Sequence, residues 1–162
     1  MESKIVVHPN VVSEQDCINL VLEIDAKNST EDVYFSGYEQ DYGIKKKRCA
    51  DHPIVKSIVD RFGYTLDSAA LVYYPSGSYN GIHCDNSVND NGVWNRVKQW
   101  ERTAILFCNN SFSGGELIYP EQGCVFIPKV GTLVEAPAGP EFLHMVNKIT
   151  SGERYTLVLR IN

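Results

Sequence analysis

The chain has 162 residues, of which 43% are hydrophobic and 22% charged, and this composition suits a single soluble domain over residues 1–162. Its formal net charge of −5 argues against a nucleic-acid partner, because phosphate contacts need a surplus of Lys and Arg on one face. The five cysteines are widely spaced without a CxxC pair, which is typical of reduced thiols. The sequence shows no leader peptide and no membrane-spanning stretch, so we expect a cytoplasmic protein without membrane contact.

The N-terminal part, about residues 1–65, is expected to be helical. One short strand and two helices are predicted over about residues 4–7, 14–27 and 53–62. Ser13 begins a capping-box pattern before the first helix, and Pro53 suits the first turn of the second helix, which ends before Gly63. Between the helices lies a polar stretch with the basic run Lys45–Arg48, which we interpret as a solvated loop.

From about residue 66 to residue 162 the pattern changes to short strands and turns. Strands are predicted over about residues 69–74, 103–108, 116–119, 124–127, 132–135, 144–146 and 155–161. This density of strands predicts a mainly β fold with flanking α-helices, a jelly-roll core with the N-terminal helices packed on one sheet. Residues 86–101 are the longest segment expected to be irregular, and such segments in a compact domain are usually functional or disordered.

His83 and Asp85 are the first residues that indicate a particular chemistry. In a strand, residues i and i+2 point to the same face, so this imidazole and carboxylate can converge on one ion while Cys84 points away. His144, far downstream and near the start of a predicted strand, is the best candidate for a third ligand. Two histidines and one carboxylate leave coordination positions open for a cosubstrate and O2, an arrangement typical of Fe(II) oxygenases.

Arg154 and Arg160 lie in the last predicted strand, which is otherwise mainly apolar. Because they are an even number of residues apart, an unbroken strand places both on one face. A buried guanidinium needs an anion, and the distal carboxylate of 2-oxoglutarate matches its fork of donors. The alternative is that either arginine reaches solvent or pairs with an acidic side chain.

Tyr74 precedes the His83/Asp85 pair in the sequence. Its phenol could turn back into the site and donate a hydrogen bond to the cosubstrate. The alternative is that Tyr74 is an ordinary core residue of its strand.

The ordered set of motifs resembles the double-stranded β-helix 2-oxoglutarate/Fe(II) oxygenases, and within them the prolyl 4-hydroxylase-like group. The matching pieces are Tyr74-Pro75-Ser76-Gly77, His83-Cys84-Asp85, Ser113-Gly114-Gly115-Glu116-Leu117, Gly131-Thr132-Leu133, His144 and Gly152-Glu153-Arg154. The resemblance covers about residues 66–162. It implies that His83, Asp85 and His144 bind iron, and that Arg154 and Tyr74 bind 2-oxoglutarate.

By this resemblance the chain would be a hydroxylase that uses Fe(II), 2-oxoglutarate and O2 and releases succinate and CO2, with ascorbate as a candidate reductant. The implied substrate is a prolyl residue of a peptide or protein. Asp85 separates a hydroxylase from the related halogenases, in which a small residue leaves room for halide.

Arg160 departs from the resemblance, because many relatives have an aromatic residue at its place. An arginine at this distance after the carboxylate-binding one is similar to the AlkB-type demethylases, so an AlkB-like oxidative demethylase is an alternative. A non-catalytic jelly-roll binding module and a cupin-type metal protein without 2-oxoglutarate are further alternatives.

Two segments are expected to meet the substrate. The side chains concerned are Trp94, Arg96 and Trp100 in residues 86–101, and Tyr38, Tyr42 and the basic run in residues 36–48. Aromatic side chains on a loop suit a peptide or a ring such as proline. The alternative is that the tryptophans only tie the loop to the sheet. Arg160 is a further candidate for substrate contact.

Overall fold

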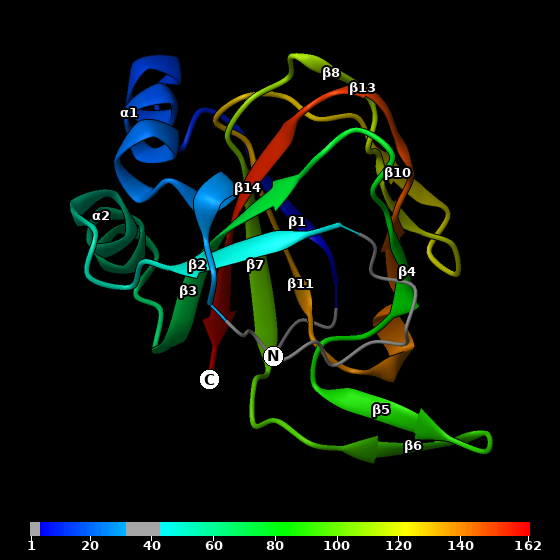
Figure 1. Ribbon diagram of the computed structural model, residues 1–162. Helices are drawn as coiled ribbons and strands as arrows, with labels where there is room; N and C mark the ends of the chain where they lie inside the picture. Colours follow the sequence, from blue (N-terminus) through cyan, green and yellow to red (C-terminus); the bar gives the residue numbers. More distant parts are fainter. Residues whose placement is uncertain (1–3, 32–42) are drawn as a thin grey trace.

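The computed structural model describes residues 4–31 and 43–162, and Figure 1 shows two helices beside a β core. The helices are α1 (Glu14–Ile24) and α2 (Pro53–Phe62), and two 3-10 turns are η1 (Ala26–Asn28) and η2 (Pro140–Phe142). The strands are β1 (Val6–His8), β2 (Lys45–Arg48), β3 (Leu66–Tyr74), β4 (Asn80–His83), β5 (Ser87–Asp90), β6 (Val93–Arg96), β7 (Arg102–Phe107), β8 (Phe112–Gly114), β9 (Leu117–Tyr119), β10 (Cys124–Phe126), β11 (Leu133–Pro137), β12 (His144–Val146), β13 (Ile149–Gly152) and β14 (Arg154–Ile161).

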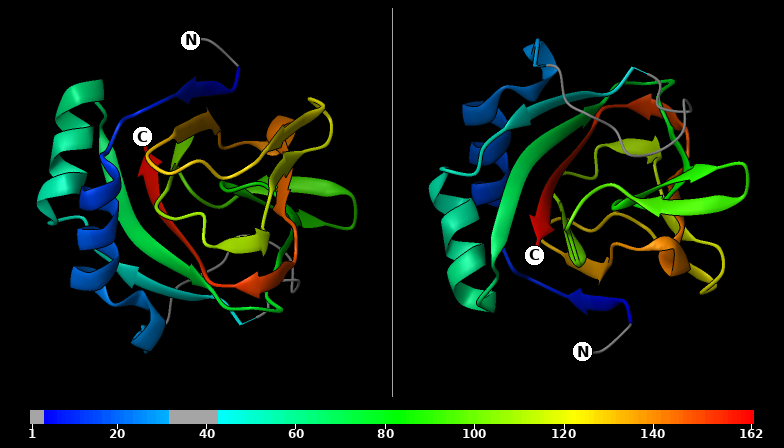
Figure 2. Two further views of the ribbon diagram at one scale, coloured as in Figure 1. Left: turned by 90° about the horizontal axis from the view of Figure 1, so that it is seen from above. Right: turned by 90° about the horizontal axis from the view of Figure 1, so that it is seen from below.

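The strands form two larger antiparallel sheets that face each other. One sheet has six strands in the order β1-β11-β7-β14-β3-β2, and the other has four in the order β10-β9-β12-β4. The pairs β13-β8 and β5-β6 complete the set. Figure 2 shows both helices on the outer face of the six-stranded sheet and the four-stranded sheet on its other side. The expected mainly β jelly roll with helices packed on one sheet is therefore confirmed.

Local signals in the sequence explain where the helices begin and end. The Ser13 side chain accepts a hydrogen bond from the backbone of Asp16 at the start of α1. Helix α1 ends earlier than expected because Asp25 adopts a left-handed conformation (φ 50°) and redirects the chain into η1. Helix α2 ends at Gly63 (φ 64°), as predicted. Neither helix in the described ranges is long and apolar enough to cross a membrane.

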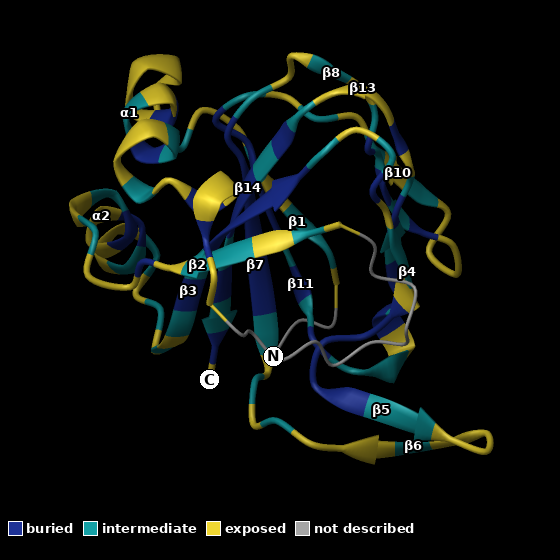
Figure 3. Ribbon diagram, viewed as in Figure 1, coloured by how far each residue is buried: buried dark blue, intermediate teal, exposed yellow. Residues whose placement is uncertain are grey.

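The two faces of the six-stranded sheet bury different residues. Leu71 of β3 and Leu157 of β14 belong to the core under the helices, whereas Val72 and Val158 belong to the cluster between the sheets. This alternation follows from the period of two along a strand. With one core on each side of the sheet, the central strands β7 and β14 and the C-terminal half of β3 are mostly buried, and Figure 3 shows them largely in the buried and intermediate colours. Arg154 and Thr156 of β14 are accordingly buried polar residues, each 1% exposed.

Two segments that we expected to be irregular form strands. The basic run Lys45–Arg48, interpreted as a solvated loop, is instead β2 and pairs with β3. Residues 86–101 contain the hairpin β5–β6, which projects from the core in Figure 1. Its turn residues Asn91 and Gly92 have positive φ angles of 52° and 86°, as the tight hairpin turn of an Asn-Gly pair requires. The Asn-Gly signal was present in the sequence, but the flanking strands are too polar to show clear alternation.

Candidate active site

His83, Asp85 and His144 meet where two strands of the four-stranded sheet pair. Strand β4 ends at His83 and β12 begins at His144, and these two residues are opposite each other in the register. Asp85 follows β4 in a turn in which the backbone N–H groups of Asp85 and Asn86 both donate to the carbonyl of Ala138, at 3.0 Å each. All three side chains are buried. These hydrogen bonds hold the turn so that the Asp85 carboxylate lies next to the imidazoles of His83 and His144.

The geometry of these three residues suits a metal ion. Asp85 Oδ1 lies 3.5 Å from Nε2 of His83 and 3.5 Å from Nε2 of His144. One ligand atom from each residue lies within 4.8 Å of the others, so the group could hold an ion. Each Nδ1 faces a backbone carbonyl, that of Gly81 for His83 (2.6 Å) and that of Phe142 for His144 (3.0 Å). Because a carbonyl only accepts, each Nδ1 atom donates to it, and each Nε2 atom is then directed toward Asp85, where a metal ion would lie.

Cys84 lies between two of these residues but takes no part in the group. Its thiol is fully buried and contacts the carbonyl of Ser87 at 3.5 Å. Burial raises the pKa of Cys84 to about 11, so the side chain remains a thiol at neutral pH. This placement agrees with the expectation that Cys84 points away.

Asp85 is held in its ionised form by positive charge. Burial would raise its pKa, but Arg160 and His144 outweigh this and hold the pKa of Asp85 well below its usual range. The ion pair is close, with Arg160 Nη1 3.0 Å from Asp85 Oδ2. An ionised carboxylate is the form that a metal ligand needs.

Arg160 connects Asp85 to Trp100. Its Nη1 also donates to the hydroxyl of Thr103 at 3.1 Å, and its guanidinium carbon lies 4.8 Å from the centre of the Trp100 ring. The indole N–H of Trp100 in turn donates to Asp67 at 2.8 Å. Of the two alternatives for Arg160, the structure shows pairing with an acidic side chain, and that side chain is Asp85 of the candidate metal group.

Arg154 has a buried guanidinium group in which one nitrogen, Nη2, has no hydrogen-bond partner among the described residues. The residue is 1% exposed, and its Nε donates to the carbonyl of Gly115 at 3.0 Å. Its Nη2 is buried and has no hydrogen-bond partner among the described residues. Burial lowers the pKa of Arg154, and the neighbouring Tyr74 acts in the opposite direction. A buried cationic donor without a partner is costly, so this position fits an anionic group such as a carboxylate.

Tyr74 lies between this arginine and the group of His83, Asp85 and His144. It is opposite Arg154 in the pairing of β3 with β14, and the guanidinium carbon lies 4.6 Å from its ring centre. Tyr74 also lines the cavity that contains His83, Asp85 and His144. Arg154 and the candidate metal group are therefore neighbours, joined through Tyr74 on the inner face of the sheets.

Gly115 belongs to the Ser113–Leu117 motif, and the sequence alone did not indicate that it contacts Arg154. Its φ is +72°, and a Cβ atom there would lie 2.7 Å from Ile149, 2.8 Å from Phe112 and 3.0 Å from Arg154. Only glycine lets the backbone approach Arg154 closely enough for its carbonyl to accept from Nε.

The residues expected to meet the substrate differ in their placement. Trp100 lines a groove next to the metal cavity. The Arg96 side chain donates to the carbonyls of Lys98 and Gln99 and to the carboxylate of Glu101, each at 2.9 Å, so it organises its own loop. Trp94 is half-buried on β6, and neither Trp94 nor Arg96 is among the described residues that line the cavity or the groove. A substrate role for these two stays a prediction, and residues 36–42, with Tyr38 and Tyr42, lie outside the described residues.

Two facing sheets that bring two histidines and one carboxylate together beside a buried arginine define a class of protein. Two histidines and one carboxylate that leave coordination positions open are the ligand set typical of the non-haem Fe(II) oxygenases.

Comparisons with known proteins lead to a particular group within that class. No family model matches the chain. A protein of Acanthamoeba polyphaga mimivirus named "Putative prolyl 4-hydroxylase" is 30% identical over 131 residues, which cover 72% of this chain and 54% of that protein. The viral collagen prolyl hydroxylase of Paramecium Bursaria Chlorella virus-1, solved with 2-oxoglutarate, matches with a TM-score of 0.76 and 16% identity over 97% of this chain and 94% of that one. A Pseudomonas putida prolyl-4-hydroxylase matches with a TM-score of 0.67 and 17% identity over 98% and 91%.

These comparisons confirm the resemblance expected from the motifs. The relatives in sequence and the neighbours in structure are prolyl 4-hydroxylase-like 2-oxoglutarate/Fe(II) oxygenases, and at 16–17% identity the structural likeness establishes the fold. The chain spans about half the length of the mimivirus relative.

Proposed function

We propose that this protein is an Fe(II)- and 2-oxoglutarate-dependent hydroxylase of prolyl residues in a peptide or protein. The observation that carries the proposal is the buried group of His83, Asp85 and His144 beside Arg154, whose Nη2 has no partner among the described residues. A metal triad alone suits many chemistries, whereas a triad with a neighbouring buried carboxylate receptor suits 2-oxoglutarate. The names of the mimivirus and Chlorella virus proteins support proline as the target.

Each residue has a role that follows from its position. Iron, with 2-oxoglutarate and O2, supplies the oxidising chemistry that places a hydroxyl on a C–H bond and yields succinate and CO2. His83, Asp85 and His144 would hold the iron and leave its remaining positions open. Arg154 would bind the distal carboxylate of 2-oxoglutarate and so fix the orientation of that molecule. Burial of all four side chains excludes bulk water from the site.

The test is succinate release that depends on Fe(II), 2-oxoglutarate and a proline-containing peptide, together with mass spectrometry of the peptide. We expect one added oxygen atom on a prolyl residue. A non-catalytic binding module would give neither signal, and a cupin-type metal protein would bind iron without binding 2-oxoglutarate under anaerobic conditions. Either result would refute the proposal.

An AlkB-like oxidative demethylase is a second candidate, favoured by Arg160. The structure gives this arginine a partner that needs no nucleic acid, because it pairs with Asp85 and contacts Trp100. The net charge of −5 also disfavours a polyanionic substrate. Formaldehyde release from methylated DNA or RNA, measured beside the peptide assay, distinguishes the two candidates.

A further inference from the structure

The backbone that carries Arg154 lies where strand pairing ends on one of its two sides. Toward β3, Arg154 is opposite Tyr74 in the pairing of the two strands. Toward β7, the pairing ends at Thr156, and one more backbone hydrogen bond follows, from the N–H of Cys108 to the carbonyl of Tyr155 at 3.0 Å. The backbone groups that come before this bond and face the β7 side need other partners, because an unpaired backbone group away from water is costly.

The side-chain amide of Asn109 supplies these partners. Its Nδ2 donates to the carbonyl of Glu153 at 2.9 Å, and its Oδ1 accepts from the backbone N–H of Tyr155 at 2.9 Å. These two backbone groups belong to the residues directly before and after Arg154. Since a backbone carbonyl only accepts and a backbone N–H only donates, the two hydrogen bonds fix the orientation of the amide. Asn109 thus takes the place of a peptide group of a neighbouring strand and holds the main chain on both sides of Arg154.

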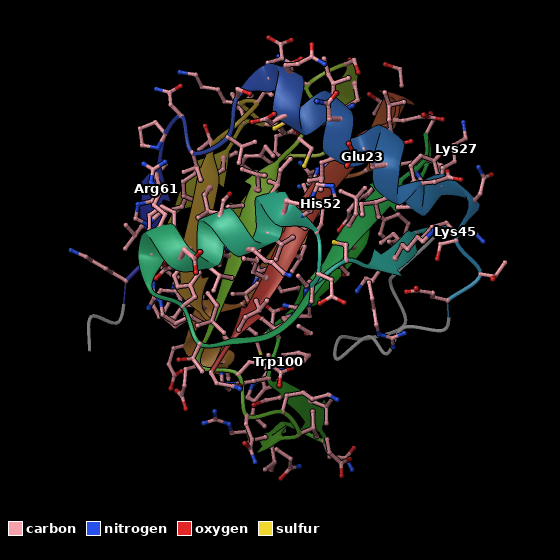
Figure 4. The ribbon with its side chains drawn as sticks, turned by 90° about the vertical axis from the view of Figure 1, so that its left-hand side faces the viewer. Glu23, Lys27, Lys45, His52, Arg61 and Trp100 are labelled. Carbon is pink, nitrogen blue, oxygen red and sulfur yellow. The ribbon has the colours of Figure 1, made fainter. Side chains whose placement is uncertain are left out.

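The side chain of Glu153 is held on the other face of the sheet. Its carboxylate accepts from Nζ of Lys27, labelled in Figure 4, at 2.8 Å and from the hydroxyl of Tyr73 at 2.9 Å. Tyr73 belongs to the core under the helices, whereas the ring next to the Arg154 guanidinium belongs to the cluster between the sheets. The ion pair is screened by solvent, because the Lys27 side chain is 53% exposed and that of Glu153 is 40% exposed. Asn109 is therefore the side chain that acts directly on the main chain at Arg154.

The Arg154 side chain is enclosed, so it has little room to compensate for a shift of its main chain. Its Nε donates to the carbonyl of Gly115 at 3.0 Å, and its guanidinium carbon lies 4.6 Å from the ring centre of Tyr74 and 5.7 Å from that of Phe107. The group that recognises a ligand must be held within about 0.5 Å of its productive position. A displacement of the Arg154 main chain would therefore move Nη2, the donor without a partner among the described residues, away from its ligand.

We propose that Asn109 is a positioning residue for 2-oxoglutarate: its amide holds the main chain of Arg154 so that the guanidinium meets the distal carboxylate of the cosubstrate. This inference rests on the proposed function, because that function gives Arg154 its ligand. Asn109 does not touch the cosubstrate and acts through Arg154 alone. The alternative is a purely structural role, in which the amide only stabilises the start of β14.

Two oxo acids of equal chain length separate the two roles. 2-Oxoglutarate has a distal carboxylate, whereas 2-oxopentanoate has the same 1-carboxylate and 2-oxo group but ends in a methyl group. Binding of each is measured without turnover, from the visible absorption band of the anaerobic Fe(II) protein. We expect the wild type to bind 2-oxoglutarate at least about tenfold more tightly. Asn109→Ala should lose about tenfold in affinity for 2-oxoglutarate and keep its affinity for 2-oxopentanoate. In turnover the same change should appear in KM for 2-oxoglutarate and not in kcat.

Three further variants exclude other causes. Asn109→Asp keeps the volume and the acceptor for Tyr155 but cannot donate to Glu153 when ionised, so it should show the same selective loss with less risk to the fold. Asn110→Asp adds the same charge at the neighbouring exposed residue and should bind both acids as the wild type does. Ser13→Ala removes the cap of α1 and should lower Tm by about 3 °C without changing either affinity.

The outcomes separate this inference from the proposed function. A selective loss of 2-oxoglutarate affinity in the folded Asn109 variants, absent from both controls, supports the positioning role. Equal losses for the two acids, or no loss for either, overturn the positioning role and leave the hydroxylase assignment intact. A wild-type protein that binds the two acids equally overturns the role of Arg154 in the proposed function, and this inference with it.

Discussion

Arg160 holds the oxygen of Asp85 that does not face the two histidines. Its Nη1 lies 3.0 Å from Oδ2, whereas Oδ1 lies 3.5 Å from Nε2 of both His83 and His144. Asp85 comes from a turn after β4, and Arg160 comes from β14 in the facing sheet. The orientation of the carboxylate is therefore set by an ion pair between the two sheets.

Removal of this ion pair should weaken metal binding. In Arg160→Gln the Asp85 carboxylate loses the charge that keeps it ionised in a buried position, and we expect the affinity for Fe(II) or Mn(II) to fall about tenfold or more. Anaerobic calorimetry measures the affinity. Arg61→Gln, at the exposed position labelled in Figure 4, is the control and should bind metal as the wild type does. Equal affinity in both variants would show that Arg160 does not position the ligand.

Loss of the carboxylate itself should abolish turnover. In Asp85→Ala one of three ligands is absent and Arg160 loses its acidic partner, so we expect neither stoichiometric metal binding nor succinate release. Asp90→Ala, at an exposed position of the β5–β6 hairpin, is the control and should retain both. Succinate release by Asp85→Ala at the wild-type rate would refute the assignment of the iron site.

Arg154 should control 2-oxoglutarate affinity without affecting metal affinity. Arg154→Lys keeps the charge but loses the fork of donors, so we expect the Kd for 2-oxoglutarate to rise about 10- to 100-fold. The visible absorption band of the anaerobic iron complex reports this binding. Arg102→Lys makes the same substitution at a partly buried arginine that pairs with Glu135, and it serves as the matched control. An unchanged Kd in Arg154→Lys would place the carboxylate elsewhere.

A substitution at Gly115 tests whether the close approach of its backbone to Arg154 matters for 2-oxoglutarate binding. In Gly115→Ala the new methyl group would overlap Ile149 and Phe112 and press on Arg154, so we expect a stability loss of about 2 kcal/mol and weaker 2-oxoglutarate binding. Gly123→Ala has a similar φ of +67° but nothing within 4 Å of its Cβ, so it reports the backbone strain alone. Denaturant unfolding and the visible band measure the two effects. Equal losses of stability and equal 2-oxoglutarate affinities in the two variants would show that the close approach of Gly115 to Arg154 has no effect on the site.

The two helices show which features can be predicted from local sequence patterns and which cannot. Ser13 and Gly63 mark a helix start and a helix end through contacts within a few residues, so the sequence predicts them well. The contact between Glu23 of α1 and His52 before α2, at 2.5 Å and visible in Figure 4, joins residues that no local pattern relates. The basic run was misinterpreted for the same reason, because only its pairing with β3 makes it a strand.

The sequence by itself indicated the fold class through its density of short strands, and the His83/Asp85 pair through the period of two along a strand. It offered His144 as the third candidate because of its residue type and its place at the start of a predicted strand. Only the tertiary structure decided which side chains lie next to His83, Asp85 and His144. The pairing of β4 with β12 brings His144 to His83, and the packing of the two sheets places Arg160 on Asp85. Such contacts join distant parts of the chain, and their geometry depends on strand register and burial, which single-residue patterns do not encode.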